Sequence, residues 1–223
     1  MKMLTRHNAE SITAKIAELG PFYHNIDLPF GITTAPEHGT PARGVNWGKL
    51  LTALPNDLSG KTVLDIGCNA GAFSIEAKKR GAARVVGFDY SQKFIDQAKF
   101  CAEVLDLEIE YSVARVDDFL SASEPFDVVI FVGVLYHLED PVGTAKLIRK
   151  VARSLCVLET VGVSPHLRAV TEGIVQFPRP KITHSGSTWI NMEGLRYLFQ
   201  EVAGFRGFEP LFDGSRIAVK LTK

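Results

Sequence analysis

The residues best placed to do chemistry follow a short apolar run that begins at Val63. Four of them stand at alternate positions: Asp65, Gly67, Asn69 and Gly71. The residues from Ala72 to Lys78 have the spacing of a helix start, so the sequence predicts a strand, a tight turn and a helix N-terminus. Glycine permits a positive φ and a close approach of a ligand to the main chain. Because a carboxylate at the strand end accepts hydrogen bonds from a ligand's donors, we expect this turn to bind a ligand.

The spacing excludes one common ligand of such turns. A dinucleotide-binding turn has the pattern G-x-G-x-x-G and places a pyrophosphate on the helix N-terminus, and the sequence lacks that pattern. A second carboxylate, Asp89, ends the next predicted strand, Arg84–Asp89, where a nucleoside-binding βαβ unit places a carboxylate on the ribose hydroxyls. The spacing from Asp65 favours this ribose role. The alternative is a cap for the predicted helix Gln92–Val104.

Two further polar residues follow a predicted buried strand. The run Phe126–Val132 is apolar apart from Asp127, as expected for a parallel strand covered on both faces, and Tyr136 and His137 come shortly after it. Ligands of open α/β sheets lie at the carboxyl ends of the strands, so both residues are expected near the ligand of the glycine turn. Both are candidate catalytic residues, with His137 as a general base near neutral pH. The alternative for His137 is a hydrogen bond that only fixes its own loop.

The totals of the sequence bound the class of protein. A length of 223 residues suits one domain with a full core and modest extensions. Lys and Arg together count 25, as do Asp and Glu, so no net charge favours a nucleic acid or an anionic membrane as partner. The three cysteines are far apart and predict neither a metal site nor disulfides. With no apolar run near about eighteen residues and no signal-peptide core, we expect a soluble, cytoplasmic protein.

Strands and helices alternate along the chain. Further strands are predicted at Glu108–Val113, Leu155–Thr160, Phe205–Leu211 and Arg216–Leu221, and further helices at Lys49–Leu54, Val142–Ala152 and Trp189–Val202. This order predicts an α/β fold with a doubly wound seven-stranded sheet. Residues 1–58 are expected to form an N-terminal extension, with a helix over Asn8–Leu19 and an active-site lid, or else a poorly ordered arm, from Pro21 to Gly48. Residues 59–223 are expected to form one compact domain with an insertion at about 161–188.

The glycine turn resembles the D-x-G-x-G-x-G turn of class I S-adenosylmethionine-dependent methyltransferases. Asn69 replaces the middle glycine, and asparagine is the non-glycine residue that best tolerates left-handed geometry. The resemblance extends to GPFYHNIDLPFGITTAPEH, LSGKTVLDIGCNAGAFSIEAKKRGA, FDVVIFVGVLYHLEDPVG, VLET and SRIAVKLTK. These stretches are similar to the group that includes the bacterial tRNA wobble-uridine methyl- and carboxymethyltransferases. They are more similar still to smaller methyltransferases found with glycosyltransferases or natural-product enzymes, and they imply a Rossmann-like methyltransferase sheet.

The resemblance also implies a cofactor, S-adenosylmethionine, and the residues that bind it. These are Asp65, Gly67, Cys68, Asn69, Gly71, Phe73, Asp89, Tyr90, Asp117, Asp118 and Val132. In this family the first acidic residue lies near the amino-acid portion of the cofactor, and an acidic side chain after the third strand meets the adenine edge. Asp117 or Asp118 would fill the adenine role, unless the two acids only form a solvated turn.

The tRNA enzymes of this group also use carboxy-S-adenosylmethionine, whose carboxylate they bind with a Lys, a Tyr and an Arg. Tyr136 and Arg216 match the last two, but the Lys position falls within Leu28–Phe30, where no base stands. Because a buried carboxylate that loses one cation is costly, S-adenosylmethionine is expected rather than its carboxylated form. Tyr136 and Arg216 would then be free to orient a polar or anionic acceptor.

The expected reaction is an in-line transfer of the sulfonium methyl group to an oxygen, or less favourably a nitrogen, of a sugar or secondary metabolite. The expected acceptor-binding residues are Trp47, Glu159, His184, Trp189 and Arg216. Simpler alternatives are core packing for the aromatic residues, a capping or structural role for Glu159, and an exposed edge-strand position for Arg216.

Two other functions stay open. An RNA-modifying enzyme would need a basic stripe near the pocket, built from residues such as Arg43, Lys49, Arg168, Arg179 and Lys181, and is not favoured. A non-catalytic regulator would bind the cofactor without space for an acceptor. No metal and no membrane partner is expected, and a homodimer is left open.

Overall fold

The computed structural model describes residues 7–34, 47–163, 174–176 and 188–223. They divide into two compact units. The first takes the described residues of Met1–Val45 and Asp57–Arg115, and the second takes those of Asn46–Asn56 and Val116–Lys223. Every helix in the described ranges is too short or too polar to cross a lipid bilayer.

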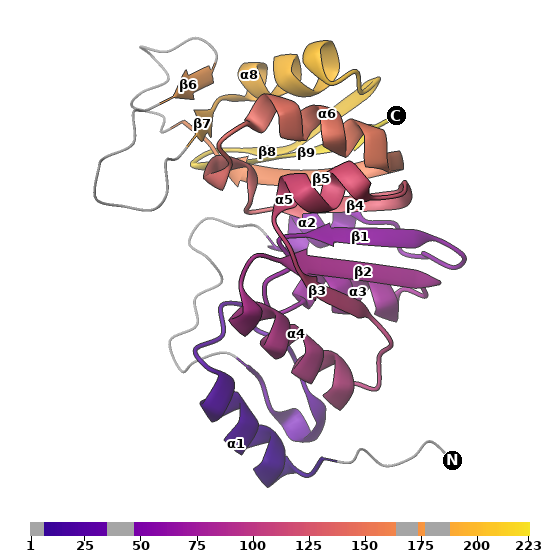
Figure 1. Cartoon of the computed structure of the whole chain (residues 1–223), viewed down its shortest axis with the longest axis vertical. Coiled ribbons are helices and arrows are strands. Elements are labelled where there is room, and N and C mark those ends of the chain that lie inside the picture. Colours follow the sequence, from indigo (N-terminus) through magenta and orange to yellow (C-terminus); the bar gives the residue numbers. More distant parts are fainter. Residues whose placement is uncertain (1–6, 35–46, 164–173, 177–187) are drawn as a thin grey trace. The chain divides into compact units, whose positions relative to one another are not determined.

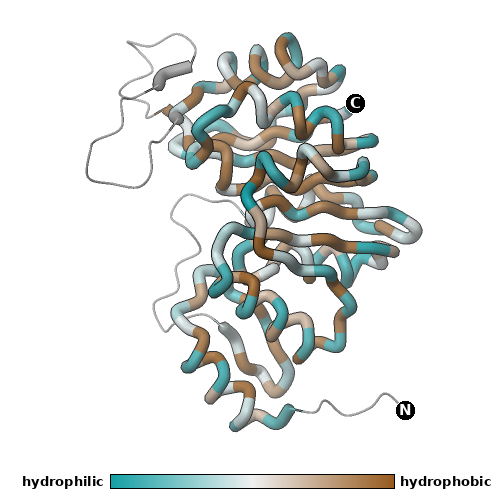
Figure 2. Tube along the Cα trace, viewed as in Figure 1, coloured by the Kyte–Doolittle hydropathy of each residue, from teal (hydrophilic) through white to brown (hydrophobic). Residues whose placement is uncertain are grey.

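Seven strands form one mixed sheet in the order β3-β2-β1-β4-β5-β9-β8, and they are rich in hydrophobic residues (Figures 1 and 2). Their bounds are Thr62–Ile66 (β1), Arg84–Asp89 (β2), Glu110–Val113 (β3), Phe126–Val132 (β4), Ala152–Val161 (β5), Gly207–Asp213 (β8) and Arg216–Thr222 (β9). β2 pairs in parallel with β1 and β3, and β4 pairs in parallel with β5. β9 pairs antiparallel with both β5 and β8. The predicted seven-stranded α/β sheet is confirmed.

The first unit adds three helices to β1, β2 and β3: α1 (Ala9–Leu19), α3 (Ala72–Lys79) and α4 (Gln92–Val104). α1 begins at a capping box, in which the side chains of Asn8 and Ser11 each accept a hydrogen bond from the other residue's main-chain amide. α1 packs against α4. Their contact is part of a buried apolar group, here called the N-terminal cluster: Ile12, Phe22, Ile26, Leu28, Ala70, Ile75, Phe100, Cys101 and Val104.

The first part of the predicted lid is packed onto this unit. Between Pro21 and Thr34 the chain makes a short turn, η1 (Pro29–Gly31), and several of its apolar side chains belong to the N-terminal cluster. The buried side chain of Gln97 donates hydrogen bonds to the main-chain carbonyls of Leu19 and Pro21, at 2.8 and 3.1 Å. Residues 35–46 of the predicted lid lie outside the described residues. The lid role therefore stays a prediction.

The second unit contains the remaining short elements. They are α2 (Trp47–Ala53), α5 (Val116–Ala122), η2 (Leu135–His137), α6 (Pro141–Val151), β6 (Ile174–Gln176), β7 (Thr188–Ile190), α8 (Met192–Arg196) and η3 (Tyr197–Val202). β6 and β7 form a separate antiparallel pair. α6 begins where Asp140 accepts a hydrogen bond from the Gly143 amide at 2.8 Å, with Pro141 in its first turn.

Several predicted elements differ from the structure. Trp189 lies in β7 and not in a helix, because its segment pairs with β6, and Asn191 then starts α8 by accepting a hydrogen bond from the Gly194 amide at 2.7 Å. Asp117 and Asp118, for which a solvated turn is the alternative, lie in the helix α5. The third strand begins at Glu110 rather than at residue 108.

Candidate functional site

The turn after β1 has the predicted left-handed backbone. Gly67, Asn69 and Gly71 have φ values of 68°, 50° and 83°. The turn is held by hydrogen bonds from the Cys68 amide to the Phe88 carbonyl at 3.0 Å and from the Gly71 amide to the Cys68 carbonyl at 2.9 Å. Asn69 thus adopts the geometry for which an asparagine is tolerated in place of glycine.

Asp65 lies at the end of β1 and is 3 % exposed. The hydroxyl of Ser74, on α3, donates a hydrogen bond to its Oδ2 atom at 2.5 Å. Burial raises the pKa of Asp65 to about 7, although the bond from Ser74 opposes the rise. A cationic group placed beside this carboxylate would favour its charged form.

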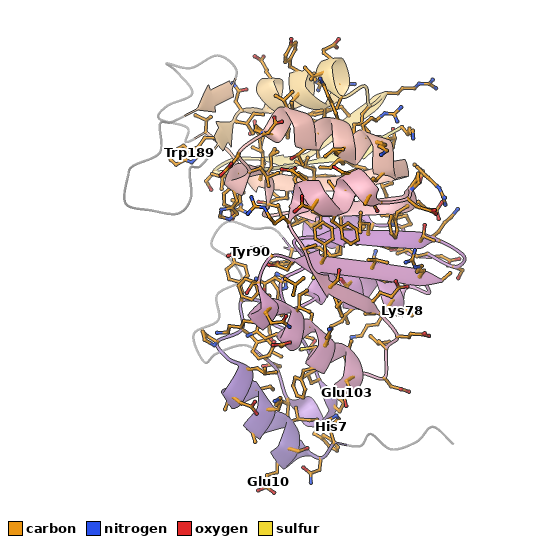
Figure 3. All side chains as sticks on the ribbon, viewed as in Figure 1. His7, Glu10, Lys78, Tyr90, Glu103 and Trp189 are labelled. Carbon is orange, nitrogen blue, oxygen red and sulfur yellow. The ribbon has the colours of Figure 1, made fainter. Side chains whose placement is uncertain are left out.

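Asp89 lies at the end of β2 and links two main-chain segments. Its Oδ2 atom accepts a hydrogen bond from the Asn69 amide at 3.1 Å, and its Oδ1 atom accepts one from the Ser91 amide at 3.0 Å. Burial raises its pKa. The bond to Ser91 fits the predicted helix-start role, yet each carboxylate oxygen can still accept from a second donor. The next residue, Tyr90, is 77 % exposed (Figure 3).

Sequence reasoning missed Tyr111, which fills the space beside the turn. A Cβ atom added at Gly71 would lie 2.3 Å from the Tyr111 hydroxyl oxygen, and one added at Gly87 would lie 2.7 Å from its ring. Both glycines are therefore needed for the ring of Tyr111 to fit. The signal available in the sequence was Gly87 itself, because a glycine inside a strand often marks a close approach.

In the second unit, four of the predicted residues lie together. The carboxylate of Glu159 is completely buried and accepts two hydrogen bonds from Arg216, one from Nε and one from Nη2, the second at 2.7 Å. The guanidinium carbon of Arg216 lies 5.1 Å from the centre of the Tyr136 ring, which in turn lies 4.0 Å from the imidazole ring of His137. Glu159 and Arg216 thus form an ion pair.

This arrangement corrects two expectations for Arg216. It is not on an edge strand, because β9 lies between β5 and β8, and its side chain is only 13 % exposed. It is also not free to orient an acceptor with its whole guanidinium group, because Glu159 binds one edge.

The charges of this group influence one another. Burial raises the pKa of Glu159, and its hydrogen bonds from Arg216 oppose the rise. Burial disfavours the charged form of Arg216, but Glu159 and Tyr136 together outweigh it, and the pKa of Arg216 is raised. Partial burial and the charge of Arg216 lower the pKa of His137, which favours the neutral imidazole that a base requires.

The other predicted residues are more scattered. Asp117 and Asp118 are exposed in the first turn of α5, where Asp117 accepts a hydrogen bond from the Thr144 hydroxyl at 2.9 Å. Cys68 and Phe73 are buried, while Trp47, Val132 and Trp189 are half-buried at the start of α2, the end of β4 and in β7. His184 lies outside the described residues.

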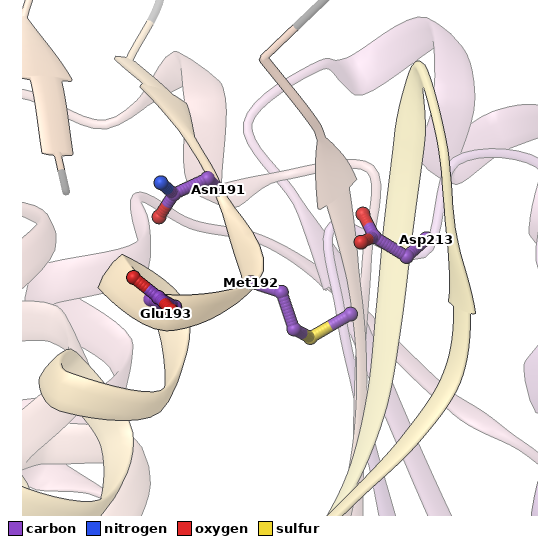
Figure 4. Close-up of a pocket in the computed structure, with 4 residues that line it drawn as sticks. All are labelled: Asn191, Met192, Glu193 and Asp213. Carbon is purple, nitrogen blue, oxygen red and sulfur yellow. The ribbon is translucent and has the colours of Figure 1, made fainter. Parts of the chain in front are cut away.

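A hollow of about 160 Å³ lies elsewhere in the second unit and is lined by Asn191, Met192, Glu193 and Asp213 (Figure 4). None of these is a predicted site residue. In the described part of the chain, no group of three or more His, Cys, Asp or Glu side chains is arranged to hold a metal ion.

Comparison with known sequences finds methyltransferases in each case. The sequence model of a family described as a methyltransferase domain matches residues 57–183. A ubiquinone biosynthesis O-methyltransferase of Neisseria meningitidis is 33 % identical over 143 residues, which cover 60 % of this chain and 59 % of that enzyme. A tRNA U34 carboxymethyltransferase of Campylobacter jejuni is 36 % identical over 97 residues, which cover 44 % of this chain and 33 % of that enzyme. The matches thus span less than two thirds of these curated relatives.

Comparison with solved structures shows the same fold over more of the chain. The N-terminal domain of EvdMO1, crystallised in the presence of S-adenosylhomocysteine (SAH) and D-fucose, superposes with a TM-score of 0.73 and 20 % identity, covering 97 % of each chain. The magnesium protoporphyrin IX methyltransferase of Synechocystis, solved with bound S-adenosylmethionine, gives a TM-score of 0.56 and 18 % identity, over 79 % of this chain and 75 % of that enzyme.

Proposed function

Because the chain belongs to the methyltransferase domain family, we propose that it transfers the methyl group of S-adenosylmethionine to an oxygen atom of a small acceptor. One observation carries the proposal: the left-handed turn Gly67–Gly71 stands with the buried carboxylates Asp65 and Asp89 at the ends of neighbouring strands. This set of groups suits a nucleoside that carries a positive charge and no phosphate.

The residues fit the cofactor at its two polar parts. Asp65 is buried, and its raised pKa marks a carboxylate that would gain from a cationic ligand such as the ammonium group of S-adenosylmethionine. Asp89 has oxygen lone pairs left for the ribose hydroxyls after its two main-chain bonds. We assign Asp117 or Asp118, which are exposed at the start of α5, to the adenine edge.

The donor is S-adenosylmethionine rather than its carboxylated form. A carboxylate on the transferred group would need free cationic partners, and one edge of Arg216 is already bound to Glu159. The Lys expected by resemblance is also missing within Leu28–Phe30. We therefore assign the group around Tyr136 and His137 to an acceptor that is neutral or weakly polar.

An oxygen acceptor has two supports. The O-methyltransferase of Neisseria meningitidis is a relative at 33 % identity, and the structure of EvdMO1 was determined with D-fucose present. A sugar or a secondary metabolite with a hydroxyl group fits both, and Trp47 and Trp189 are the side chains we assign to its apolar face.

The mechanism needs little chemical activation by the protein. S-adenosylmethionine, when bound, supplies an already activated methyl group. The turn and the carboxylates at the ends of β1 and β2 would hold the donor. The acceptor hydroxyl oxygen would attack the methyl carbon in line while its bond to sulfur breaks, with water excluded. A neutral His137 takes the proton of that hydroxyl as the bond to carbon forms, which matters most for a hydroxyl of high pKa.

The second candidate function is the methylation of a tRNA wobble uridine, which the 36 % identity to the Campylobacter jejuni enzyme favours. Of the basic stripe that it needs, Lys49 is exposed on α2, and Arg43, Arg168, Arg179 and Lys181 lie outside the described residues. The tRNA hypothesis therefore stays an alternative.

Calorimetric titration with S-adenosylmethionine and with SAH tests the cofactor. Radiolabelled methyl transfer to three acceptor sets, namely sugars, phenolic metabolites and unmodified tRNA, then tests the acceptor. Binding of both nucleosides with transfer to a sugar or phenol is the expected result. Transfer to tRNA alone would establish the second candidate, binding without any transfer would indicate a regulator, and no binding would contradict the proposal.

A further inference from the structure

The position of Glu159 in the sheet explains why it meets Arg216. β5 and β9 pair so that Glu159 faces Ala218, which makes Arg216 its diagonal neighbour on the same face of the sheet. The buried carboxylate then binds the Nε and Nη2 edge of the guanidinium group. Two parallel hydrogen bonds of this kind fix the plane of a guanidinium group as well as its position.

The fixed guanidinium group contacts the loop that carries the candidate base. Its carbon lies 5.1 Å from the centre of the Tyr136 ring, and the Tyr136 and His137 rings are 4.0 Å apart with an interplanar angle of 44°. The main chain of Glu159 holds the same loop, because its carbonyl accepts a hydrogen bond from the Gly133 amide at 3.1 Å. Glu159 thus supports the segment between β4 and η2 through both its side chain and its main chain.

We propose that Glu159 is a positioning residue for His137. By holding Arg216 over Tyr136, it fixes the tilted contact between the two rings that orients the imidazole in η2. The inference rests on the proposed function, in which His137 takes the proton of the acceptor hydroxyl, and it moves Glu159 from acceptor binding to the support of a catalytic side chain.

The charges around His137 make the inference measurable. β5 and β7 pack against η2, and Arg216 of β9 lies over the Tyr136 ring. β5 contributes Glu159 at the end that pairs with Val132, while the described residues of β7, Thr188–Ile190, include no titratable side chain. β9 contributes Arg216, and Tyr136, Glu139 and Asp140 lie on the same loop as His137. Because Glu159 offsets the charge of Arg216, its removal should leave an uncompensated cation beside the imidazole.

The test compares Glu159→Gln with the parent protein by NMR titration of the His137 imidazole, whose signal is assigned by its loss in His137→Ala. The expected result is a fall in the pKa of His137 by about one pH unit. The kcat of methyl transfer should fall about tenfold, while the Kd of S-adenosylmethionine stays within about twofold. The matched control is Glu209→Gln, which removes a carboxylate 3.8 Å from another β9 cation, Lys220, and should change neither quantity.

A double variant separates positioning from stability. Glu159→Gln/Arg216→Gln removes both buried charges, so the protein should regain most of the stability that the single variant loses. Its kcat should nevertheless stay about tenfold low, because Arg216 no longer holds the Tyr136 ring. Recovery of kcat together with stability would overturn the inference, because Glu159 would then be only structural.

The outcomes also separate the inference from the proposed function. A shifted His137 titration in a protein that methylates no acceptor would contradict the proposed function and leave the positioning role intact. Normal methyl transfer by Glu159→Gln with an unchanged His137 titration would contradict the positioning role alone.

Discussion

The main-chain amide of Asn69 donates a hydrogen bond to the Asp89 carboxylate at 3.1 Å, and this bond ties the turn after β1 to the end of β2. The same carboxylate accepts from the Ser91 amide at 3.0 Å, so one side chain fixes both the turn and the start of α4. The shape of the proposed cofactor site therefore depends on Asp89 before any ligand binds.

Asp89→Ala should weaken S-adenosylmethionine binding by roughly 1.5 to 3 kcal/mol, because both the ribose acceptor and the bond to the turn are lost. Calorimetric titration measures the change. Asp96→Ala, which removes an exposed carboxylate bonded to Gln92 on α4, is the control and should bind like the parent. Equal affinities for Asp89→Ala and the control would remove the ribose assignment.

Asp65 should make stability depend on pH in the direction opposite to most carboxylates. Its pKa is about 7 in the folded protein, against an ordinary value of 3.8, so the native state binds the proton more tightly than the unfolded state. Its contribution to the free energy of unfolding is therefore full at low pH, falls as the pH rises from about 4 to about 7, and is constant above that.

The side chain of Asp65→Asn stays neutral, so this variant does not lose stability as the pH rises. Relative to the parent, the variant should gain stability between pH 4 and pH 7, by up to about 4 kcal/mol for a shift of about three pH units. Urea unfolding at several pH values without cofactor measures this difference, from which the titration of groups that do not interact with Asp65 cancels. A difference independent of pH would show that Asp65 ionises at its ordinary value.

Gly71→Ala should destabilise the protein through both backbone and packing. Its φ is 83°, and a new Cβ atom would lie 2.3 Å from the Tyr111 hydroxyl oxygen. Gly60→Ala is a matched control, because φ there is 72° and no atom lies within 4 Å of the added Cβ. The control should cost about 1 kcal/mol in urea unfolding and Gly71→Ala about 2 to 4 kcal/mol. Equal costs would mean that Tyr111 moves aside.

His137→Ala should lower kcat by about a hundredfold or more if the imidazole takes the acceptor proton, and should leave the Kd of S-adenosylmethionine unchanged. The loss should be smaller for an acceptor whose hydroxyl is already acidic, because less proton transfer is then needed. His7→Ala, in the first unit beside Glu103, is the control. A near-normal rate with every acceptor would assign His137 to loop structure.

Local periodicity was enough to predict many elements. Mostly apolar segments predicted the bounds of β2 and β4, and the helical segment after β2 predicted those of α4. The error at Trp189 arose because β7 exists by pairing with β6, and no local pattern encodes that pairing.

In the candidate site too, local features could be predicted and long-range pairing could not. The left-handed turn could be predicted because Gly67, Asn69 and Gly71 carry their backbone preference in their residue types. The pairing of Glu159 with Arg216 could not, because it depends on the register between β5 and β9.

Gln97 should link the N-terminal extension to the cofactor turn. It is completely buried, and its amide nitrogen donates to the main-chain carbonyls of Leu19 and Pro21. These two hydrogen bonds hold the segment that follows α1. That segment packs in the N-terminal cluster, which also includes Ala70 of the turn. Gln97→Ala removes this donor from two main-chain carbonyls, so it should cost about 1 to 3 kcal/mol in urea unfolding. It should also weaken S-adenosylmethionine binding severalfold, because the cluster that supports Ala70 loosens.

The control is Gln92→Ala, which loses only an exposed hydrogen bond to Asp96 on the same helix and should change neither the stability nor the affinity by much. Lower stability with unchanged affinity would show that the extension does not support the turn.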